Sequence, residues 1–429
     1  MIAMKKKLVT LLVSILVLML FVFMFEHASA ASEDTWVSKA SMAHARANLA
    51  TAAVNGKIYA IGGDAGSETG CCMTGTSMTY NVVNYTEEYD PILNHWAEKA
   101  SMPTPRAFFG TAVYQGKIYC IGGYNGATVK TGPQDYEWET QYYALSANEA
   151  YDPASNNWTT GSPMPTARNK AATNIVDGKI FVIGGIGMGN FETYNTTEVY
   201  DPETDSWTTK TPAPLPVASP ASAVVDKKIY VLGQNPKGYS NIVEIYDPAT
   251  DTWVVKDVAP VSYAATAVAT TGVNALKRIY FFDDKRTDIY DPATNTWSVG
   301  TPVPTTNLLL AKAAVLDDII YLLGGRTGQL EHIVLMYPSN LTEQYFPMGY
   351  GIPDHSTPTP PPTPTPSPMP IASPTGNVTS PSEQVPPEQV SSVGDQASSQ
   401  QINPLILISG TAVVLVGIVS MLSIIKKRR

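Results

Sequence analysis

Short apolar runs separated by turn residues recur through the middle of the chain. TAAV (51–54) and KIYAIGG (57–63) flank Asn55-Gly56, and Gln115-Gly116 and Asp177-Gly178 stand between similar runs further on. Pairs of this kind suit the positive φ angles of a two-residue hairpin turn. The pattern therefore predicts short antiparallel strands joined in hairpins.

Two sequence lines repeat in the same register along this region. The first line comprises KIYAIGG (57–63), KIYCIGG (117–123), KIFVIGG (179–185), KIYVLGQ (228–234), RIYFFDD (278–284) and IIYLLGG (319–325). The second comprises YDPILNHW (89–96), YDPASNNW (151–158), YDPETDSW (200–207), YDPATDTW (246–253) and YDPATNTW (290–297). Six repeat units result, and repeats of this length are typical of solenoids and propellers.

Each unit is expected to form four short strands. The Asn-Gly type of pair joins the first strand to the second, and the YDP line turns the third strand into the fourth. In that turn the Pro fixes φ, while the Asp and Asn side chains bond nearby backbone N–H groups. One such sheet cannot bury both of its faces alone, whereas six sheets packed around an axis can.

These residues resemble the kelch repeat. The glycine pair at the end of a strand, the Tyr and the Trp about seven residues later are the kelch signature, and the resemblance covers roughly residues 36–345. It implies an all-β protein, a six-bladed kelch-type β-propeller over residues 31–350 with one repeat per blade. Gly233-Gln234 and Asp283-Asp284 replace the glycine pair, so we expect blades 4 and 5 to end their second strands differently.

The sixth unit has no Trp, and the start of the chain offers one. TWVSKASMAHAR (35–46) resembles HWAEKASMPTPR (95–106), which ends the first unit. We therefore expect residues 307–337 to supply three strands of the last blade and the N-terminal strand to be the fourth, which closes the ring without an exposed edge. The alternative is that LTEQYF (341–346) is that fourth strand.

Both ends of the chain carry patterns typical of membrane proteins. Residues 1–30 contain three Lys, a long apolar run and Ala28-Ser29-Ala30, which predict a cleaved signal peptide, although the run is long enough for an uncleaved anchor. The apolar residues 405–425 are long enough to cross a bilayer as one transmembrane helix. The basic tail 426–429 predicts a cytoplasmic end, because positive charge favours that side of the membrane.

The segment before the apolar run is rich in Pro, Thr and Ser. Residues 351–404 contain few apolar side chains to bury, so we expect a disordered, extended stalk. A linker without any further role would have the same geometry. Together these segments predict a single-pass protein of the cell membrane with its propeller on the extracellular side.

The charge of the chain disfavours some partners. The 429 residues have a net charge of −9, and residues 31–404 carry 21 basic and 36 acidic side chains. An acidic surface of this kind argues against nucleic acid and against anionic lipid surfaces as partners. The 34 Pro and 31 Gly agree with turn-rich β structure.

The sequence shows no catalytic set and no metal site. His44, His95 and His332 are the only His of the propeller, and no pair of them has metal-ligand spacing. Kelch propellers include a copper-radical galactose oxidase and a sialic-acid mutarotase. The chain has too little His for the first, and the few acid and base groups that the second needs cannot be singled out. We expect no cofactor.

Two sets of residues are candidates for ligand binding. Arg46, Arg106 and Arg168 stand twelve residues before a strand Ile, where blades 4 and 6 have Val217 and Leu308. In kelch repeats such an Arg is commonly structural, and the alternative is a basic arc over blades 1 to 3. The second set lies in the long insert of blade 2 and consists of Tyr124, Tyr136, Trp138, Tyr142 and Tyr143. These rings either anchor a partner or pack the insert onto its own blade.

Cysteine and sequon positions add candidate modifications. Cys120 takes a strand position and is expected to be a buried hydrophobic side chain, whereas the adjacent Cys71 and Cys72 are a possible disulfide in an exported protein. Five sequons are candidates for glycosylation, at Asn84, Asn157, Asn195, Asn340 and Asn377.

The sequence thus favours a recognition or adhesion module that binds an extracellular protein or a surface glycan. A stalk places a binding head away from the membrane, and no catalytic residues stand out. The alternatives are a tethered carbohydrate-active enzyme of the mutarotase kind and a structural component of the cell envelope. Fold alone does not decide among them.

Overall fold

The computed structural model describes residues 32–66, 68–71, 75–78, 81–130, 138–187, 192–234, 241–259, 266–283, 286–306, 308–329 and 333–351. These residues form β-strands joined by turns and loops. None of them belongs to a helix long and apolar enough to cross a membrane. The predicted signal peptide, transmembrane helix and tail, and the stalk after Gly351, lie outside the described residues.

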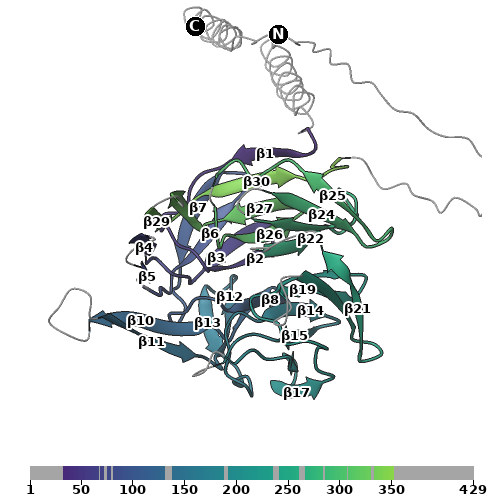
Figure 1. Cartoon of the computed structure of the whole chain (residues 1–429), viewed down its shortest axis with the longest axis horizontal. Helices are drawn as coiled ribbons and strands as arrows, with labels where there is room; N and C mark the ends of the chain where they lie inside the picture. The colour runs from purple at the N-terminus through teal and green to yellow at the C-terminus, as the bar shows by residue number, and fades with distance from the viewer. Residues whose placement is uncertain are drawn as a thin grey trace, which may run out of the picture. The chain divides into compact units, whose positions relative to one another are not determined.

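Six four-stranded antiparallel sheets form the blades of a propeller (Figure 1). In blades 1 to 5 the strands follow one another in sequence from the innermost to the outermost. Blade 1 is β2 (Ala50–Val54), β3 (Lys57–Ile61), β6 (Thr86–Asp90) and β7 (His95–Lys99); blade 2 is β8 (Gly110–Tyr114), β9 (Lys117–Ile121), β12 (Asn148–Asp152) and β13 (Asn157–Thr160); blade 3 is β14 (Ala172–Val176), β15 (Lys179–Ile183), β16 (Thr197–Asp201) and β17 (Ser206–Lys210). Blade 4 is β18 (Ala221–Val225), β19 (Lys228–Gln234), β20 (Asn241–Asp247) and β21 (Thr252–Ala259), and blade 5 is β22 (Thr266–Ala269), β23 (Ile279–Phe282), β24 (Thr287–Asp291) and β25 (Thr296–Gly300).

The hydrophobic core is divided among the six seams between blades. The innermost strands contact one another around the ring in the order β2, β8, β14, β18, β22 and β26 (Lys312–Leu316), which returns to β2. One hydrophobic cluster lies at each seam. The cluster between blades 1 and 2 includes Tyr59, Tyr151 and Cys120, which is fully buried as the sequence predicted.

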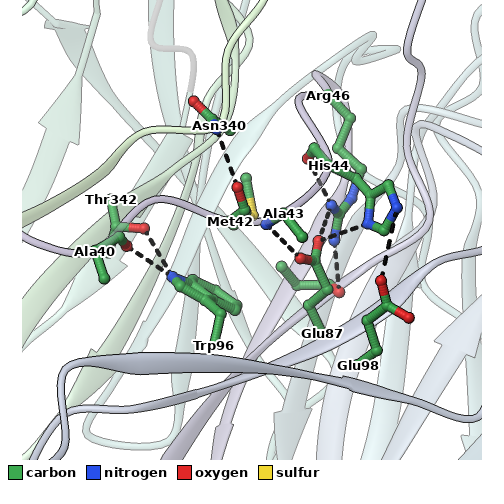
Figure 2. Close-up of polar contacts among 11 residues, drawn as sticks. Ala40, Met42, Ala43, His44, Arg46, Glu87, Trp96, Glu98, Asn340 and Thr342 are labelled. Atoms are coloured by element: carbon green, nitrogen blue, oxygen red, sulfur yellow. Dashed lines mark hydrogen bonds and ion pairs between the residues drawn. The ribbon is translucent and has the colours of Figure 1, made fainter.

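In blades 1 to 4, the repeated Tyr and Trp fasten the blade to the connection that enters it. In blade 1, Tyr89 Oη donates to Asn94 Oδ1 at 2.7 Å, and the ring centroids of Tyr89 and Trp96 are 5.1 Å apart. Trp96 Nε1 donates to the carbonyl of Ala40 at 2.8 Å (Figure 2). The same indole bond recurs in blades 2, 3 and 4, from Trp158 to Ala100, Trp207 to Ser162 and Trp253 to Thr211. The second repeat line therefore encodes contacts between blades as well as a turn.

The glycine pair of the first line allows close approach between blades. Gly62 has a φ of +56°, and a Cβ there would lie 2.6 Å from the carbonyl oxygen of Arg106 in the next connection. Blade 4 differs as the sequence predicted, since β19 continues through Gln234. For blade 5 the prediction was wrong about the strand end, because β23 ends at Phe282, the position equivalent to Ile61 in blade 1. Asp283 then bonds the backbone of Arg286.

The N-terminal strand closes the last blade, as predicted. Blade 6 has the order β1 (Thr35–Ser38), β30 (Thr342–Phe346), β27 (Ile319–Leu323) and β26, so β1 is the outermost strand. Trp36 Nε1 donates to the carbonyl of Thr301 at 3.0 Å, and Tyr345 Oη donates to Asp34 Oδ1 at 2.6 Å. Asp34 and Trp36 are two residues apart, like Asn94 and Trp96, so the chain start completes the Tyr-turn-Trp unit of the other blades.

The third strand of blade 6 was predicted wrongly. We expected it to end near Tyr337, with residues 341–346 as the alternative fourth strand, but β30 is the third. Residues further upstream instead form a separate sheet with an insert of blade 1, in the order β28 (Arg326–Gln329), β29 (Ile333–Pro338), β4 (Glu68–Cys71) and β5 (Gly75–Met78). Met336-Tyr337-Pro338 resembles the YDP line, but the Tyr at the equivalent position is Tyr345. It is followed by Phe346 and Pro347, so the YDP sequence is not recognisable there.

Candidate binding site at the channel mouth

The three arginines lie in the core, each paired with a glutamate. Arg106 is fully buried, and its Nη2 lies 3.0 Å from Glu149 Oε2 and 3.0 Å from the carbonyl oxygen of Cys120. Arg168 and Glu198 are 2.9 Å apart, and Arg46 makes the same pair with Glu87, as Figure 2 shows. We call each Arg–Glu pair a clamp, because it joins the connection between two blades to the third strand of the second.

The clamps indicate a structural role for the three candidate arginines. Burial lowers the pKa of each guanidinium below its ordinary value, and the partner glutamate opposes that effect. A ligand would reach these groups only by displacing Glu87, Glu149 or Glu198. The geometry therefore supports the structural role of the arginines and gives the basic arc no support.

We call the place of the clamp arginine in each blade the clamp position; blades 4 and 6 have Val217 and Leu308 there. Two residues after this position, the chain forms a ring around the channel mouth. Here φ is positive, between +51° and +59°, at Asn48, Phe108, Lys170, Ser219 and Leu310. The N–H of Phe108 donates to the carbonyl of Asn48 at 3.0 Å, that of Lys170 to Phe108 at 2.8 Å, and that of Ser219 to Lys170 at 3.1 Å. The N–H of Asn48 donates to Leu310 at 3.2 Å. We call these five residues the collar; the corresponding part of blade 5 lies outside the described residues.

Two lysines from opposite blades stand at or beside the collar. Lys170 belongs to blade 3, and Lys312 is the first residue of β26 in blade 6; both are half-buried. Burial lowers the pKa of Lys170, and burial together with the charge of Lys170 lowers the pKa of Lys312 to about 8. Lys170 Nζ also lies 4.6 Å from the ring centre of Phe108. The mouth therefore combines two half-buried amines with an aromatic ring.

Below the collar, the innermost strands of blades 1 to 4 line a cavity of about 310 Å³. Thr51, Thr111 and Thr173 contribute hydroxyl groups to its wall. Thr111 Oγ1 donates to the carbonyl of Thr51 at 2.8 Å, and Thr51 Oγ1 donates to that of Ala313 at 2.7 Å. The lining residues carry no charge, so the positive charge of this region is concentrated at the mouth.

Long inserts begin beside the collar. The insert of blade 2 forms the hairpin β10 (Tyr124–Lys130) and β11 (Trp138–Ala144), which projects from the propeller (Figure 1). Ala107, next to the collar, pairs with Tyr124, and Leu309 pairs in the same way with Arg326 at the start of β28. The separate sheet of blades 6 and 1 and the blade 2 hairpin therefore both start at the channel mouth.

The aromatic candidates divide within this hairpin. Tyr124 is buried, with its ring centroid 6.2 Å from that of Phe108, whereas Tyr143 is 50% exposed. The strand positions of Trp138 and Tyr142 face Lys130 and Gly126 across the hairpin, but their side chains, like the whole of Tyr136, lie outside what the structure describes. Tyr124 thus packs near the collar, and Tyr143 is exposed at the surface.

Sequence reasoning missed the collar residues and the two lysines. The sequence contains a regularity that could have located the collar, because each collar residue follows the clamp position of its blade by two residues. The side chains at that offset differ in all five blades, so the repeat itself does not mark them. Lys312 was hidden for a different reason: it stands where the inner strands of blades 1 to 4 begin with Ala or Gly.

The remaining candidates are placed as follows. His44 stacks on Tyr85 with ring centroids 3.9 Å apart, and its two nitrogens lie 3.8 Å from Glu87 and from Glu98 (Figure 2). Within the described ranges, no group of three or more His, Cys, Asp and Glu side chains is arranged to hold a metal ion. His332, Cys72 and the side chain of Cys71 lie outside those ranges, so the possible disulfide remains a prediction.

The described sequons differ in exposure. Asn157 is exposed at the start of β13. The side-chain amides of Asn84, Asn195 and Asn340 instead donate to backbone carbonyls, of Met102 at 3.0 Å, Ala213 at 2.9 Å and Met42 at 3.0 Å. A glycan on any of these three would be attached to the nitrogen that makes this bond. Asn377 lies outside the described residues.

Comparison with known proteins identifies the repeats. The kelch motif matches residues 45–103, 105–165, 167–214 and 216–255. The kelch-like protein terF of Aspergillus terreus is 31% identical over 35% of this chain, and the Influenza virus NS1A-binding protein homolog of Mus musculus is 42% identical over 20% of it. Kelch-like ECH-associated protein 1A of Danio rerio is 32% identical over 23%. The matched regions span 29%, 11% and 15% of these relatives' own lengths.

A solved structure has the same fold. The structure of YjhT superposes with a TM-score of 0.51 and 14% identity, over 70% of this chain and 95% of YjhT. At this level of identity the likeness concerns the fold alone.

Proposed function

Since the propeller of this chain is built from kelch repeats, we propose that it is a binding protein whose partner places an acidic group at the channel mouth. The observation that carries the proposal is the half-burial of Lys170 and Lys312 at the collar, where the charge of Lys170 acts on Lys312. The proposed partner is an extracellular protein with exposed Asp or Glu side chains. A glycan that carries carboxylates is the other source of such a group, and the experiment below separates the two.

The chemistry of the mouth suits a carboxylate. Burial lowers the pKa of both lysines, and the charge of Lys170 lowers that of Lys312 further. An anion at the mouth would offset this loss of hydration and the repulsion that acts on Lys312. A hydrogen bond between charged groups in such a site is stronger than one in open water. The ring of Phe108 adds apolar contact to the same site.

Two further observations support a binding role. The inserts of blades 1, 2 and 6 start at the collar and surround the mouth with additional strands, and inserts on a repeating scaffold are common places for recognition. One relative is named for binding the influenza NS1A protein and another for association with ECH. Protein partners are therefore the class that the comparisons favour.

Replacing either lysine is expected to weaken binding to acidic ligands. The purified protein would be tested against an array of Asp- and Glu-containing peptides and an array of glycans with and without carboxylates. Lys170→Met and Lys312→Met should each lower affinity roughly 10- to 100-fold, the usual effect of losing one bond to a charged group. Binding should also weaken as salt increases.

The matched control is Lys227→Met, which removes an exposed lysine paired with Asp177 at the surface and should leave affinity unchanged. Equal effects of all three substitutions would contradict a specific site at the mouth. Loss of binding only in the pair Trp138→Ala and Tyr142→Ala would move the site to the hairpin. Binding confined to carboxylated glycans would replace the protein partner with a glycan.

We also propose that the propeller faces the outside of the cell, on the basis of the apolar run 405–425 and the basic residues 426–429. Protease added to intact cells is expected to release a propeller-sized fragment and leave a short stub in the membrane. The same digestion of lysed cells is the control. A propeller that is cleaved only after lysis would show that it does not face outward.

A further inference from the structure

Blade 4 keeps the glutamate of the clamp but lacks its arginine. Glu244 on β20 corresponds to Glu198 on β16, since each stands two residues before the Tyr of its YDP turn. At the clamp position blade 4 has Val217, which is buried in the hydrophobic cluster between blades 3 and 4. A carboxyl group therefore remains in a place built for an ion pair.

Glu244 is isolated compared with its equivalents. It is only 1% exposed; its Oε1 accepts a hydrogen bond from the N–H of Leu215 at 3.1 Å, and its Oε2 has no partner among the described residues. In blade 3 the equivalent carboxylate receives the hydroxyl of Thr166 at 2.7 Å and the guanidinium of Arg168 at 2.9 Å.

In blades 5 and 6 the carboxyl group at this position has a side-chain partner other than the clamp arginine. Asp288 on β24 is bonded to Arg286 at 2.6 Å, and Glu343 on β30 accepts from the hydroxyl of Ser38 at 2.9 Å. Within the described part of the chain, Glu244 is thus the one carboxyl group at this position without a side-chain partner.

Among the described residues, charged groups on the surrounding elements do not compensate. Lys228 on β19 is bonded to Asp247 at 3.2 Å, Lys256 on β21 is exposed, and Lys210 on β17 acts on Asp251. In blade 3, Glu198 is held by Arg168, and residues 211–219 contain no charged side chain. Burial therefore raises the pKa of Glu244 from 4.5 to about 7.

The connection that covers Glu244 also reaches the collar. We call residues 211–219 the strap. Leu215 binds Glu244, the N–H of Val217 donates to the carbonyl of Tyr194 at 3.1 Å, and the N–H of Ser219 donates to Lys170 at 3.1 Å. An opening of the strap therefore changes the backbone next to the lysine of the channel mouth.

We propose that the strap is a proton-controlled gate beside the channel mouth, closed over neutral Glu244 and loosened when Glu244 ionises. This inference stands independently of the proposed ligand. Closing the strap buries a carboxyl group that prefers its protonated form, whereas opening returns that group to water. Opening therefore becomes easier as pH rises from about 4.5 to about 7 and changes little above that range.

Amide hydrogen exchange of the full chain tests the gate. After correction for the intrinsic effect of pH on exchange, the opening constant of residues 215–219 is expected to rise about 60-fold between pH 5 and pH 7.5. The corresponding segment of blade 3, residues 166–170, is the internal control, because its clamp is complete; its opening constant should stay constant.

Two variants separate the gate from general loosening. Glu244→Gln keeps the shape of the side chain without an ionisable proton, so its strap should stay closed at every pH. Val217→Arg should likewise close the strap by restoring the clamp. A strap that opens equally at pH 5 and pH 7.5 in the natural protein would overturn the proposal. So would an unchanged pH dependence in Glu244→Gln with blade 3 still protected.

Discussion

Deletion of residues 31–42 is expected to lower the free energy of unfolding of the propeller by about 4 kcal/mol or more, or to cause aggregation. The deletion removes β1 from its pairing with β30, and Met42 from the seam between blades 6 and 1. It also removes Trp36, whose ring centroid lies 4.8 Å from that of Tyr345, and leaves the hydroxyl of Tyr345 without its partner Asp34. Denaturant unfolding of the intact and truncated proteins would measure the difference.

Val37→Thr is the matched control for this deletion. Val37 is 40% exposed on the outer strand, so its replacement by another β-branched residue should change stability by less than about 0.5 kcal/mol. A truncated protein that unfolds at the same denaturant concentration as the intact one would show that β30 is stable as an outer edge. Aggregation of the truncated protein alone would agree with an exposed strand edge.

Arg106→Met is expected to destabilise the propeller by about 3–5 kcal/mol, because it leaves the carboxylate of Glu149 buried without its cation. The double variant Arg106→Met with Glu149→Gln should recover much of this loss, since it removes the uncompensated charge. Thermal and denaturant unfolding at neutral pH would measure both. Equal stability of the single and double variants would contradict the assignment of the loss to the unpaired charge.

A surface ion pair provides the comparison. Lys57 and Asp90 lie 2.6 Å apart near the surface, and Lys57→Met should cost only about 0–1 kcal/mol. The two substitutions remove the same kind of charge, so the difference between them isolates the effect of burial.

Much of the fold could be predicted because its determinants are local and repeated. The hairpin pairs, the YDP turns and the Trp positions each specify a contact within about ten residues or with the adjacent connection. Closure by the N-terminal strand was predictable for the same reason, since residues 35–46 repeat the sequence of residues 95–106. The third strand of blade 6 was missed because Phe346 replaces the Asp of its turn.

The candidate site was harder to predict because it depends on contacts across the ring. Lys170 and Lys312 are 142 positions apart by their residue numbers and come from opposite blades. Neither stands at a position that the repeat keeps constant. The arginines could be recognised from the sequence because they recur at one repeat position, and at that position they hold blades together. Positions that the repeat keeps constant therefore predict the fold, whereas the candidate site lies at positions that vary between blades.

The pairing of β1 with β30 also sets an order of events during synthesis. Asp34 and Tyr345 are 311 residues apart, so the first of the propeller's described strands to leave the ribosome is among the last to pair. At a translation rate of 5–20 residues per second, that strand waits roughly 15–60 s for its neighbour. Five blades can assemble during this time, while β30, the strand of blade 6 that pairs with β1, has not yet been made. The nascent chain therefore carries an unpaired strand through most of its translation, and any factor that shields strand edges would act on it during this interval.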